Sequence, residues 1–319
     1  MLHAPQSGPA RTRGAPGPSY TSETQLPTDL AEMRVSEPWA PIIAWAAVLL
    51  ASDLDLIVAR LLGASAPPAW EPFLRAALLA AGAVAIPRTG RLLHMRGFVL
   101  ALAALVTGHS LQAEIERRIA WFATAARADH MFVGVFLTLI PAALMGLTLL
   151  RSGLSRRDLF LTWGDWRAAS SSPVLRGARW NAIAPVLLVF ISGGLILQLW
   201  IVSHASRHFR AGALLAALPA AVMFAVLNAG CEEFRFRCVL LARGLRSLGP
   251  THAIWSTSAL FGLAHFGGHP SGFSGVAMAG FFAWVLASSM LDTGGWGWAW
   301  LLHFVQDVII FLMVAMTGT

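Results

Sequence analysis

The run LLAALPAAVMFAVLNAGCEEFRFRCVLL, at residues 214–241, decides the fold because it places two glutamates and two arginines within an otherwise apolar segment. A helix needs about 20 apolar residues to cross a bilayer, and this run is long enough. An acid or an arginine at the centre of such a helix costs about 2.5 kcal/mol or more, so these residues usually serve a function. The run therefore predicts a membrane-spanning helix that carries part of a polar site.

The composition of the whole chain fits a membrane protein. Of its 319 residues, 56% are hydrophobic and 12% are charged, and the mean hydropathy is +0.64. About 25% of the residues of a soluble protein are charged. The net charge of +7 comes from arginines in the loops between apolar runs rather than on one polar face. This pattern is typical of loops that orient a membrane protein and argues against a nucleic-acid partner.

Apolar runs recur along most of the sequence. They predict an all-α fold, a polytopic transmembrane helical bundle of about eight or nine spans. The second run is short, which leaves the count open between these two numbers. The candidate spans are residues 40–63, 73–87, 97–113, 130–150, 181–203, 211–229 (running on towards 243), 251–266, 275–291 and 296–316.

Four segments differ in composition. Residues 1–38 are rich in Pro, Gly, Ser and Thr and predict a disordered polar tail. N-terminal transmembrane helices are expected in 39–150. The stretch 151–179 is rich in Arg and Trp, which suit the headgroup boundary, and it predicts a cytoplasmic interfacial loop with a short helix. The catalytic transmembrane core is expected in 180–316.

Arginine-rich loops set the predicted orientation. They follow the second, fourth and sixth candidate spans, which places them on one side of the bilayer if the spans alternate. Because positive loops stay in the cytoplasm, this side and the N-terminus are predicted to be cytoplasmic. The basic loop 204–210 lies on the opposite side and is a counter-signal.

The first polar cluster is EEFRFR at residues 232–237. Glu233 and Arg237 are four residues apart and share a helix face, so the arginine can hold the glutamate ionised. Glu232 lies about 100° around the helix and is free to face a neighbouring helix as a general base. A solvated helix end is the alternative interpretation, and the apolar runs on both sides favour a buried site instead.

Two further clusters lie on later apolar segments. Phe261 and His265 are four residues apart, as are His303 and Asp307, so the members of each pair share a helix face. Taken alone, His265 would more often be a packing residue than a catalyst. The His303–Asp307 pair could equally lock helix packing, with Asp307 accepting from an imidazole N–H.

A depth argument brings the three clusters together. We expect turns near Leu248 and at Gly294–Gly295, on the same side of the bilayer. At about 1.5 Å per residue, the polar side chains of all three clusters then reach a similar depth. The sequence therefore predicts one polar cavity within the bilayer, with the groups needed to activate a water molecule.

In order and spacing, these clusters resemble the motifs EExxxR, FxxxH and HxxxD of the CPBP family, the CAAX protease and bacteriocin-processing (Abi) family. This family includes the type II CAAX prenyl endopeptidases, and the resemblance covers about residues 180–316. It implies an intramembrane glutamic endopeptidase that hydrolyses a peptide bond of a membrane-associated protein or peptide. Prenylated CAAX tails are eukaryotic and nothing in the sequence indicates a eukaryote, so we expect a bacterial inner membrane protein.

The resemblance also implies roles for the first two clusters. Glu232 would activate a water for attack on a peptide carbonyl, with help from His265. Glu233 and Arg237 would position that base and balance its charge.

The third cluster departs from part of the family. His303 and Asp307 would steady the tetrahedral oxyanion, yet eukaryotic CAAX proteases usually have Asn at the second position. Because an ionised Asp would repel an oxyanion, we expect Asp307 to be protonated or bonded to His303. The predicted substrate pocket is formed by Asn228, Phe236 and Phe261.

Two other functions stay open. Two glutamates and two histidines can bind zinc, but the sequence has no HExxH motif and most ligands would come from separate helices, so we expect no cofactor. A non-catalytic immunity or binding protein, or a transporter, is the second alternative, although the inverted repeats of many transporters are not found. The expected partners are the lipid bilayer and a protein or peptide substrate, and the sequence predicts no oligomeric state.

Overall fold

The described residues of the computed structural model form an all-helical protein, which confirms the predicted fold class. Between helices, the only pairing of strand type in this part of the chain is an isolated bridge of Ala169 with Arg179. The predicted disordered tail, 1–38, lies outside the described residues. The structure describes residues 39–88, 92–150, 152–172, 175, 177–203 and 212–317.

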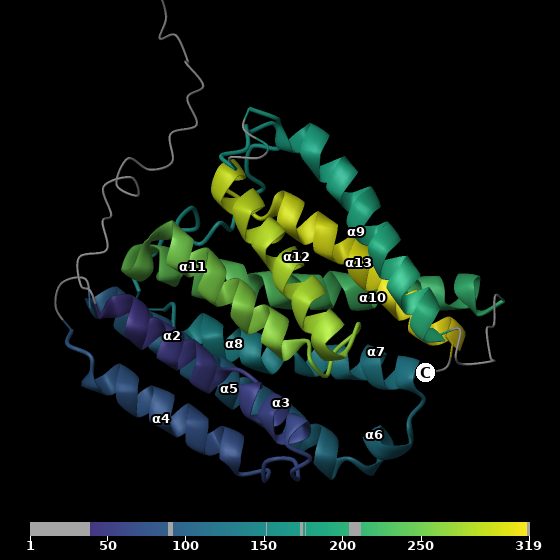
Figure 1. The fold of residues 1–319 in the computed structure, drawn as a ribbon, viewed down its shortest axis with the longest axis horizontal. Coiled ribbons are helices and arrows are strands. Elements are labelled where there is room, and N and C mark those ends of the chain that lie inside the picture. The colour runs from purple at the N-terminus through teal and green to yellow at the C-terminus, as the bar shows by residue number, and fades with distance from the viewer. Residues whose placement is uncertain are drawn as a thin grey trace, which may run out of the picture.

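The helices form two groups that meet along a central pair. Figure 1 shows α2 to α5 on one side and α9, α12 and α13 on the other, with α10 and α11 running between them. In the central region α10 packs along α13 and α11 packs along α12. The elements are α2 Ala40–Ala51, α3 Leu54–Leu61, α4 Glu71–Ala85, α5 Leu92–Arg118, α6 Ala120–Thr124, α7 Arg127–Leu137, α8 Leu139–Leu147, α9 Trp180–Ser203, α10 Ala213–Glu233, the π-helix η1 Phe234–Leu241, α11 Ala242–Ala264, α12 Gly272–Thr293 and α13 Gly297–Thr317.

Six helical segments of the described chain are long and apolar enough to cross a membrane, or seven if the bent pair α2 and α3 forms one span. The predicted count of eight or nine is not confirmed. The predicted span 211–229, with its extension towards 243, and the span 251–266 belong to one helical run of 51 residues, and the 15 residues of α4 reach only about 22 Å. The six segments are Leu92–Arg118, Arg127–Leu147, Trp180–Ile201, Leu214–Ala264, Gly272–Thr293 and Gly297–Met316.

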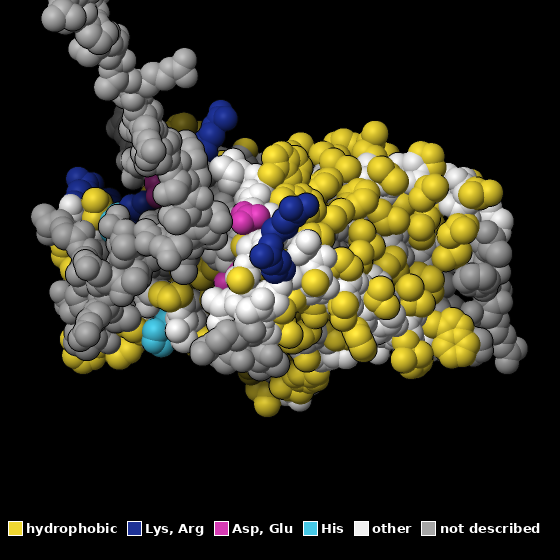
Figure 2. All heavy atoms as spheres, turned by 90° about the horizontal axis from the view of Figure 1, so that it is seen from above, with side chains coloured by type: hydrophobic (Ala, Val, Ile, Leu, Met, Phe, Trp, Pro, Cys, Tyr) yellow, Lys and Arg dark blue, Asp and Glu magenta, His cyan; other side chains and the backbone are white. Residues whose placement is uncertain are grey.

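The surface of the molecule supports an integral membrane protein. Figure 2 shows hydrophobic side chains over most of the right half of one face, with few charged groups among them. Large apolar side chains of α9 are exposed, including Val189 and Phe190 at 72% and 73%. Contiguous apolar surface of this kind marks contact with lipid or with a partner, and the length of the helices favours lipid.

Glycines form the two turns that the sequence predicts. Gly249 interrupts α11 with a φ of 74° and a ψ of 171°, a conformation that is open almost only to glycine. Gly294 ends α12 in the left-handed conformation, with a φ of 68°. The first turn lies one residue beyond the expected Leu248, and the second lies at the expected Gly294–Gly295. As a result, the part of α11 after Gly249 returns towards η1, where the Phe236 and Phe261 rings lie 5.0 Å apart, centre to centre.

The loop between α8 and α9 packs over the turn that joins α12 to α13. Asp165 donates its backbone N–H to the Thr293 carbonyl at 2.8 Å, and the Trp180 indole donates to the Asp292 carboxylate at 2.9 Å. The expectation of a short helix within 151–179 is wrong for the described residues, which form turns. Backbone contacts with α12 satisfy groups that a helix would have paired internally.

Gly262 sets the distance between α11 and α12. A Cβ at this position would lie 2.7 Å from the Val276 carbonyl oxygen and 3.0 Å from the Gly280 Cα atom, so the two backbones touch. We expect Gly262→Ala to lower the free energy of unfolding by about 1–3 kcal/mol, because the helices must move apart. A thermal melt of the protein in detergent measures the loss of stability. Gly82→Ala is the control, since a Cβ there meets nothing within 4 Å; a Gly262 variant that melts no lower than this control would contradict the prediction.

Candidate active site

The glutamate pair lies where α10 changes into a π-helix. Glu232 and Glu233 end α10, and η1 begins at Phe234 and carries both Arg235 and Arg237. π-helical segments are rare and frequently occur at functional sites. Seven of the eight residues of η1 are buried, so this irregular segment is enclosed by packing against its neighbours.

Glu233 lies at the centre of a buried polar network. Its side chain is fully buried, and its Oε1 atom lies 3.2 Å from Nη1 of Arg237, as the spacing of four residues predicts. The same oxygen accepts a hydrogen bond from Nδ1 of His303 at 2.7 Å. The Arg237 guanidinium also lies 4.5 Å from the centre of the Phe261 ring. These contacts balance the glutamate charge and fix both partners.

His303 is oriented by Glu233 rather than by Asp307. Its Nε2 atom lies 3.5 Å from Oε2 of Glu232 and 3.8 Å from Oδ1 of Asp307, which is beyond hydrogen-bond length. Of the two expected arrangements, a hydrogen bond from His303 to Asp307 is not formed in this structure, although the two side chains lie within ion-pair distance, and a protonated Asp307 stays a prediction. Helical spacing places His303 and Asp307 on one face, but Nδ1 of His303 points across to α10, where Glu233 accepts its hydrogen bond. Asp307 instead accepts from the Asn228 amide at 3.2 Å.

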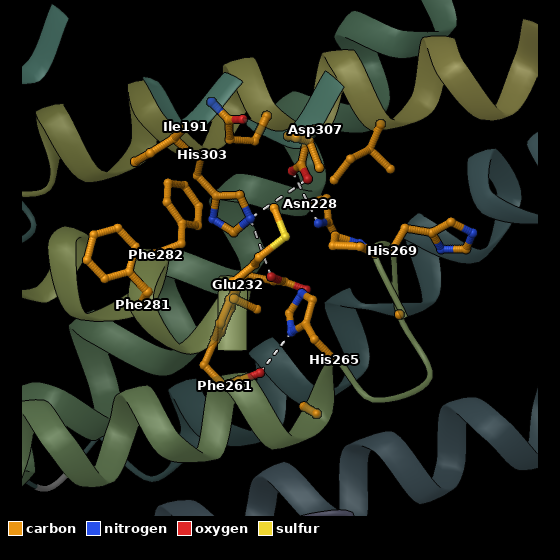
Figure 3. Close-up of a pocket in the computed structure, with 18 of the residues that line it drawn as sticks. Ile191, Asn228, Glu232, Phe261, His265, His269, Phe281, Phe282, His303 and Asp307 are labelled. Carbon is orange, nitrogen blue, oxygen red and sulfur yellow. Dashed lines mark hydrogen bonds and ion pairs between the residues drawn. The ribbon is translucent and has the colours of Figure 1, made fainter. Parts of the chain in front are cut away.

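His265 ends α11 with one ring nitrogen engaged. Its Nδ1 atom donates to the Phe261 carbonyl at 2.8 Å, and its ring lies 4.4 Å from the Phe261 ring, centre to centre. The proton on Nδ1 leaves Nε2 as an acceptor in the neutral imidazole. Figure 3 shows the His265 ring next to Glu232, on the opposite side of the glutamate from Asp307.

These side chains line one cavity of about 660 Å³. Most of the predicted site residues form its wall, and Figure 3 shows several of them around the cavity, whereas Glu233 and Arg237 do not line it. Oε2 of Glu232 is buried and has no hydrogen-bond partner among the described residues. The predicted residues that line the cavity are Asn228, Glu232, Phe236, Phe261, His265, His303 and Asp307.

Sequence reasoning missed three polar residues of the cavity wall, His109, Arg235 and Gln306. Arg235 was visible three residues after Glu232, at a spacing that puts both on neighbouring positions of a helix. His109 lies within the apolar span 97–113 and was open to the same argument as His265, but no motif connects it to the other clusters.

His269 also lines the cavity, from the loop between α11 and α12. Burial lowers the pKa of His269 to about 4, and the nearby Arg127 acts in the same direction. The ring is therefore neutral at neutral pH and adds no charge to the edge of the cavity. Within the described part of the chain, no group of three or more His, Cys, Asp or Glu side chains is arranged to hold a metal ion.

Comparison with known proteins gives a result for the same part of the chain. Residues 212–309 match a family model named Rce1-like, whose description is type II CAAX prenyl endopeptidase Rce1-like. The match runs from the start of α10 into α13 and includes all six predicted catalytic residues. No curated protein and no solved structure matches the chain significantly. Residues 212–309 are therefore similar to the type II CAAX prenyl endopeptidases, and this match supports a membrane endopeptidase of the CAAX protease type in general.

Proposed function

We propose that the chain is an intramembrane endopeptidase in which Glu232 activates the water that hydrolyses a peptide bond. One observation carries this proposal. Oε2 of Glu232 is buried in the cavity without a hydrogen-bond partner among the described residues. A buried carboxylate oxygen is costly unless it is hydrogen-bonded, and a water molecule can supply that bond. The test is a cleavage assay of the reconstituted protein and its Glu232→Gln variant.

The first chemical step uses Glu232 and His265. A water held between the Glu232 carboxylate and Nε2 of His265 loses a proton to the glutamate while its oxygen attacks the carbonyl carbon of the peptide bond. The carbonyl oxygen then carries the negative charge of a tetrahedral intermediate. General-base catalysis of this kind contributes about 10²- to 10⁴-fold to a rate.

Stabilisation of the oxyanion is assigned to His303. As an imidazolium, His303 donates from Nδ1 to Glu233 and can donate from Nε2 into the cavity. Glu233 and Arg237 hold the ring in place. Collapse of the intermediate breaks the C–N bond, and Glu232 returns its proton to the leaving nitrogen, so that the products are an acid and an amine.

Much of the remaining cavity wall is apolar and suits a substrate within the membrane. α9 contributes Leu187, Phe190 and Ile191, and α12 contributes Met278 and Phe281. These walls exclude bulk water, which strengthens the electrostatic interactions around the scissile bond. The proposed substrate is a protein or peptide that lies in or on the bilayer. We propose that the enzyme itself resides in the bacterial inner membrane, with its N-terminus in the cytoplasm.

Zinc is the alternative source of an activated water. We expect cleavage by the purified protein to stay within about twofold of its initial rate after treatment with EDTA or 1,10-phenanthroline, because the proposed mechanism uses only side chains. A zinc protease of the HExxH class, assayed in the same buffer, is the positive control. Loss of activity that returns on addition of zinc would contradict the metal-free mechanism.

A further inference from the structure

Arg235, which is buried, and His109, which is partly buried, form a hydrogen-bonded pair at the cavity wall, and none of the roles above uses them. Nη1 of Arg235 lies 2.6 Å from Nε2 of His109. Arg235 is only 2% exposed, and it reaches the cavity from η1, whereas His109 comes from α5. The two residues join the matched segment, 212–309, to a helix that lies outside it.

The direction of this hydrogen bond follows from the chemistry of arginine. A guanidinium has only donors, so Nε2 of His109 must accept and cannot carry a proton. The His109 imidazole therefore accepts a hydrogen bond from Arg235 through an unprotonated nitrogen and does not draw the arginine charge into an ion pair. A neutral partner leaves the arginine charge available to the other groups around it.

All three nitrogens of the Arg235 guanidinium contact neighbouring groups. Nε donates to the Cys231 carbonyl at 3.1 Å, and Nη1 donates to His109. Because the guanidinium is a planar, rigid fork, these two bonds fix the position of the third nitrogen. That nitrogen, Nη2, lies 3.6 Å from Oε1 of Glu232. The remaining oxygen of Glu232, Oε2, has no hydrogen-bond partner among the described residues and lies 3.5 Å from Nε2 of His303 at the cavity wall.

We propose that Arg235 is a positioning residue for Glu232 and that His109 acts through Arg235. The arginine attracts Oε1 and so directs Oε2 towards the water and the substrate. This inference rests on the proposed role of Glu232 as the base. It also assigns a part in the active site to α5, so the N-terminal helices complete the site.

Close packing of α5 explains how His109 keeps its place. The neighbouring Gly108 approaches α8 so closely that a Cβ would lie 2.3 Å from the Pro141 Cα atom. Side chains on this turn of α5 are therefore held at a fixed distance from α8, and α5 also contacts η1. A rigid support of this kind is what a positioning residue requires.

The test measures kcat and KM of the full-length protein, reconstituted in liposomes, for Arg235→Gln, Arg235→Lys, His109→Gln and the double variant Arg235→Gln/His109→Gln. We expect Arg235→Gln to lower kcat by up to about 100-fold with KM within about twofold, because a misplaced base slows the chemical step more than binding. Lysine should restore part of the loss. His109→Gln should act in the same direction with a smaller effect, and the double variant should match Arg235→Gln.

Two comparisons make the result decisive. Arg243→Gln removes another buried arginine, which donates to the Thr148 carbonyl and does not line the cavity, so its kcat should stay at the wild-type value even if its melting temperature falls. Wild-type kcat in Arg235→Gln, alongside an inactive Glu232→Gln variant, would overturn the inference and leave the proposed function standing. If the fold-loss of kcat in the double variant equals the product of the losses in the two single variants, His109 does not act through Arg235. If Arg235→Gln does not fold, wild-type kcat in both Arg235→Lys and His109→Gln would overturn it.

Discussion

Glu232→Gln is expected to lower kcat by about 10²- to 10⁴-fold without loss of the folded protein. The amide has nearly the same shape as the carboxylate, so it preserves packing in the cavity, but it cannot take a proton from water. The measurement is cleavage of a membrane peptide in liposomes, with products identified by mass spectrometry and kcat determined at saturating substrate. Folding is checked by the thermal melt of the same preparation.

The matched control is Glu116→Gln, another glutamate of a long apolar helix. Glu116 lies in α5 near His130 and does not line the cavity, so its variant should cleave at the wild-type rate. A Glu232→Gln protein that cleaves within about twofold of wild type would refute the glutamate mechanism. A variant without cleavage that keeps its cellular phenotype would favour the alternative of a binding or immunity protein.

Spacing and glycine placement made much of the fold predictable. Long apolar runs gave the helical class, because only paired backbone groups are stable in hydrocarbon. The turns near 248 and 294 followed from Gly249 and Gly294–Gly295, and they bring residues from α10, α11 and α13 to one cavity. Four-residue spacing correctly indicated the contact between Glu233 and Arg237.

Other features depend on contacts that spacing does not encode. The choice of Glu233 as the partner of His303 is decided by the direction of the ring across the interface of α10 and α13. The π-helix depends on packing around η1 and has no simple sequence signal. The role proposed for His109 requires knowing which face of α5 meets η1, and a sequence of uniformly apolar helices does not show it. The span count stays open because α4 is short and the run 214–264 bends at Gly249.

Arg237→Met is expected to lower the free energy of unfolding by about 3–5 kcal/mol, because it removes the guanidinium partner of the buried Glu233 carboxylate and leaves His303 as its one remaining contact. Glu233 is fully buried and Arg237 is 2% exposed, so water cannot replace the lost partner. The measurement is the denaturant-dependent unfolding of the protein in detergent, followed by tryptophan fluorescence. Glu233→Gln combined with Arg237→Met should recover part of the loss, since the carboxylate and the guanidinium are then removed together.

Arg246→Met provides the surface control for this buried pair. Arg246 lies 2.7 Å from Asp158, but both side chains are about one-third exposed, and pairs of this kind contribute about 0–1 kcal/mol. If the Arg237 variant loses no more stability than the Arg246 variant, the Glu233–Arg237 contact does not stabilise the buried network. A large loss for Arg237 that the double variant partly restores would instead show that the charges are coupled. Their role would then be to hold His303 and the end of α10 in the geometry on which the proposed chemistry depends.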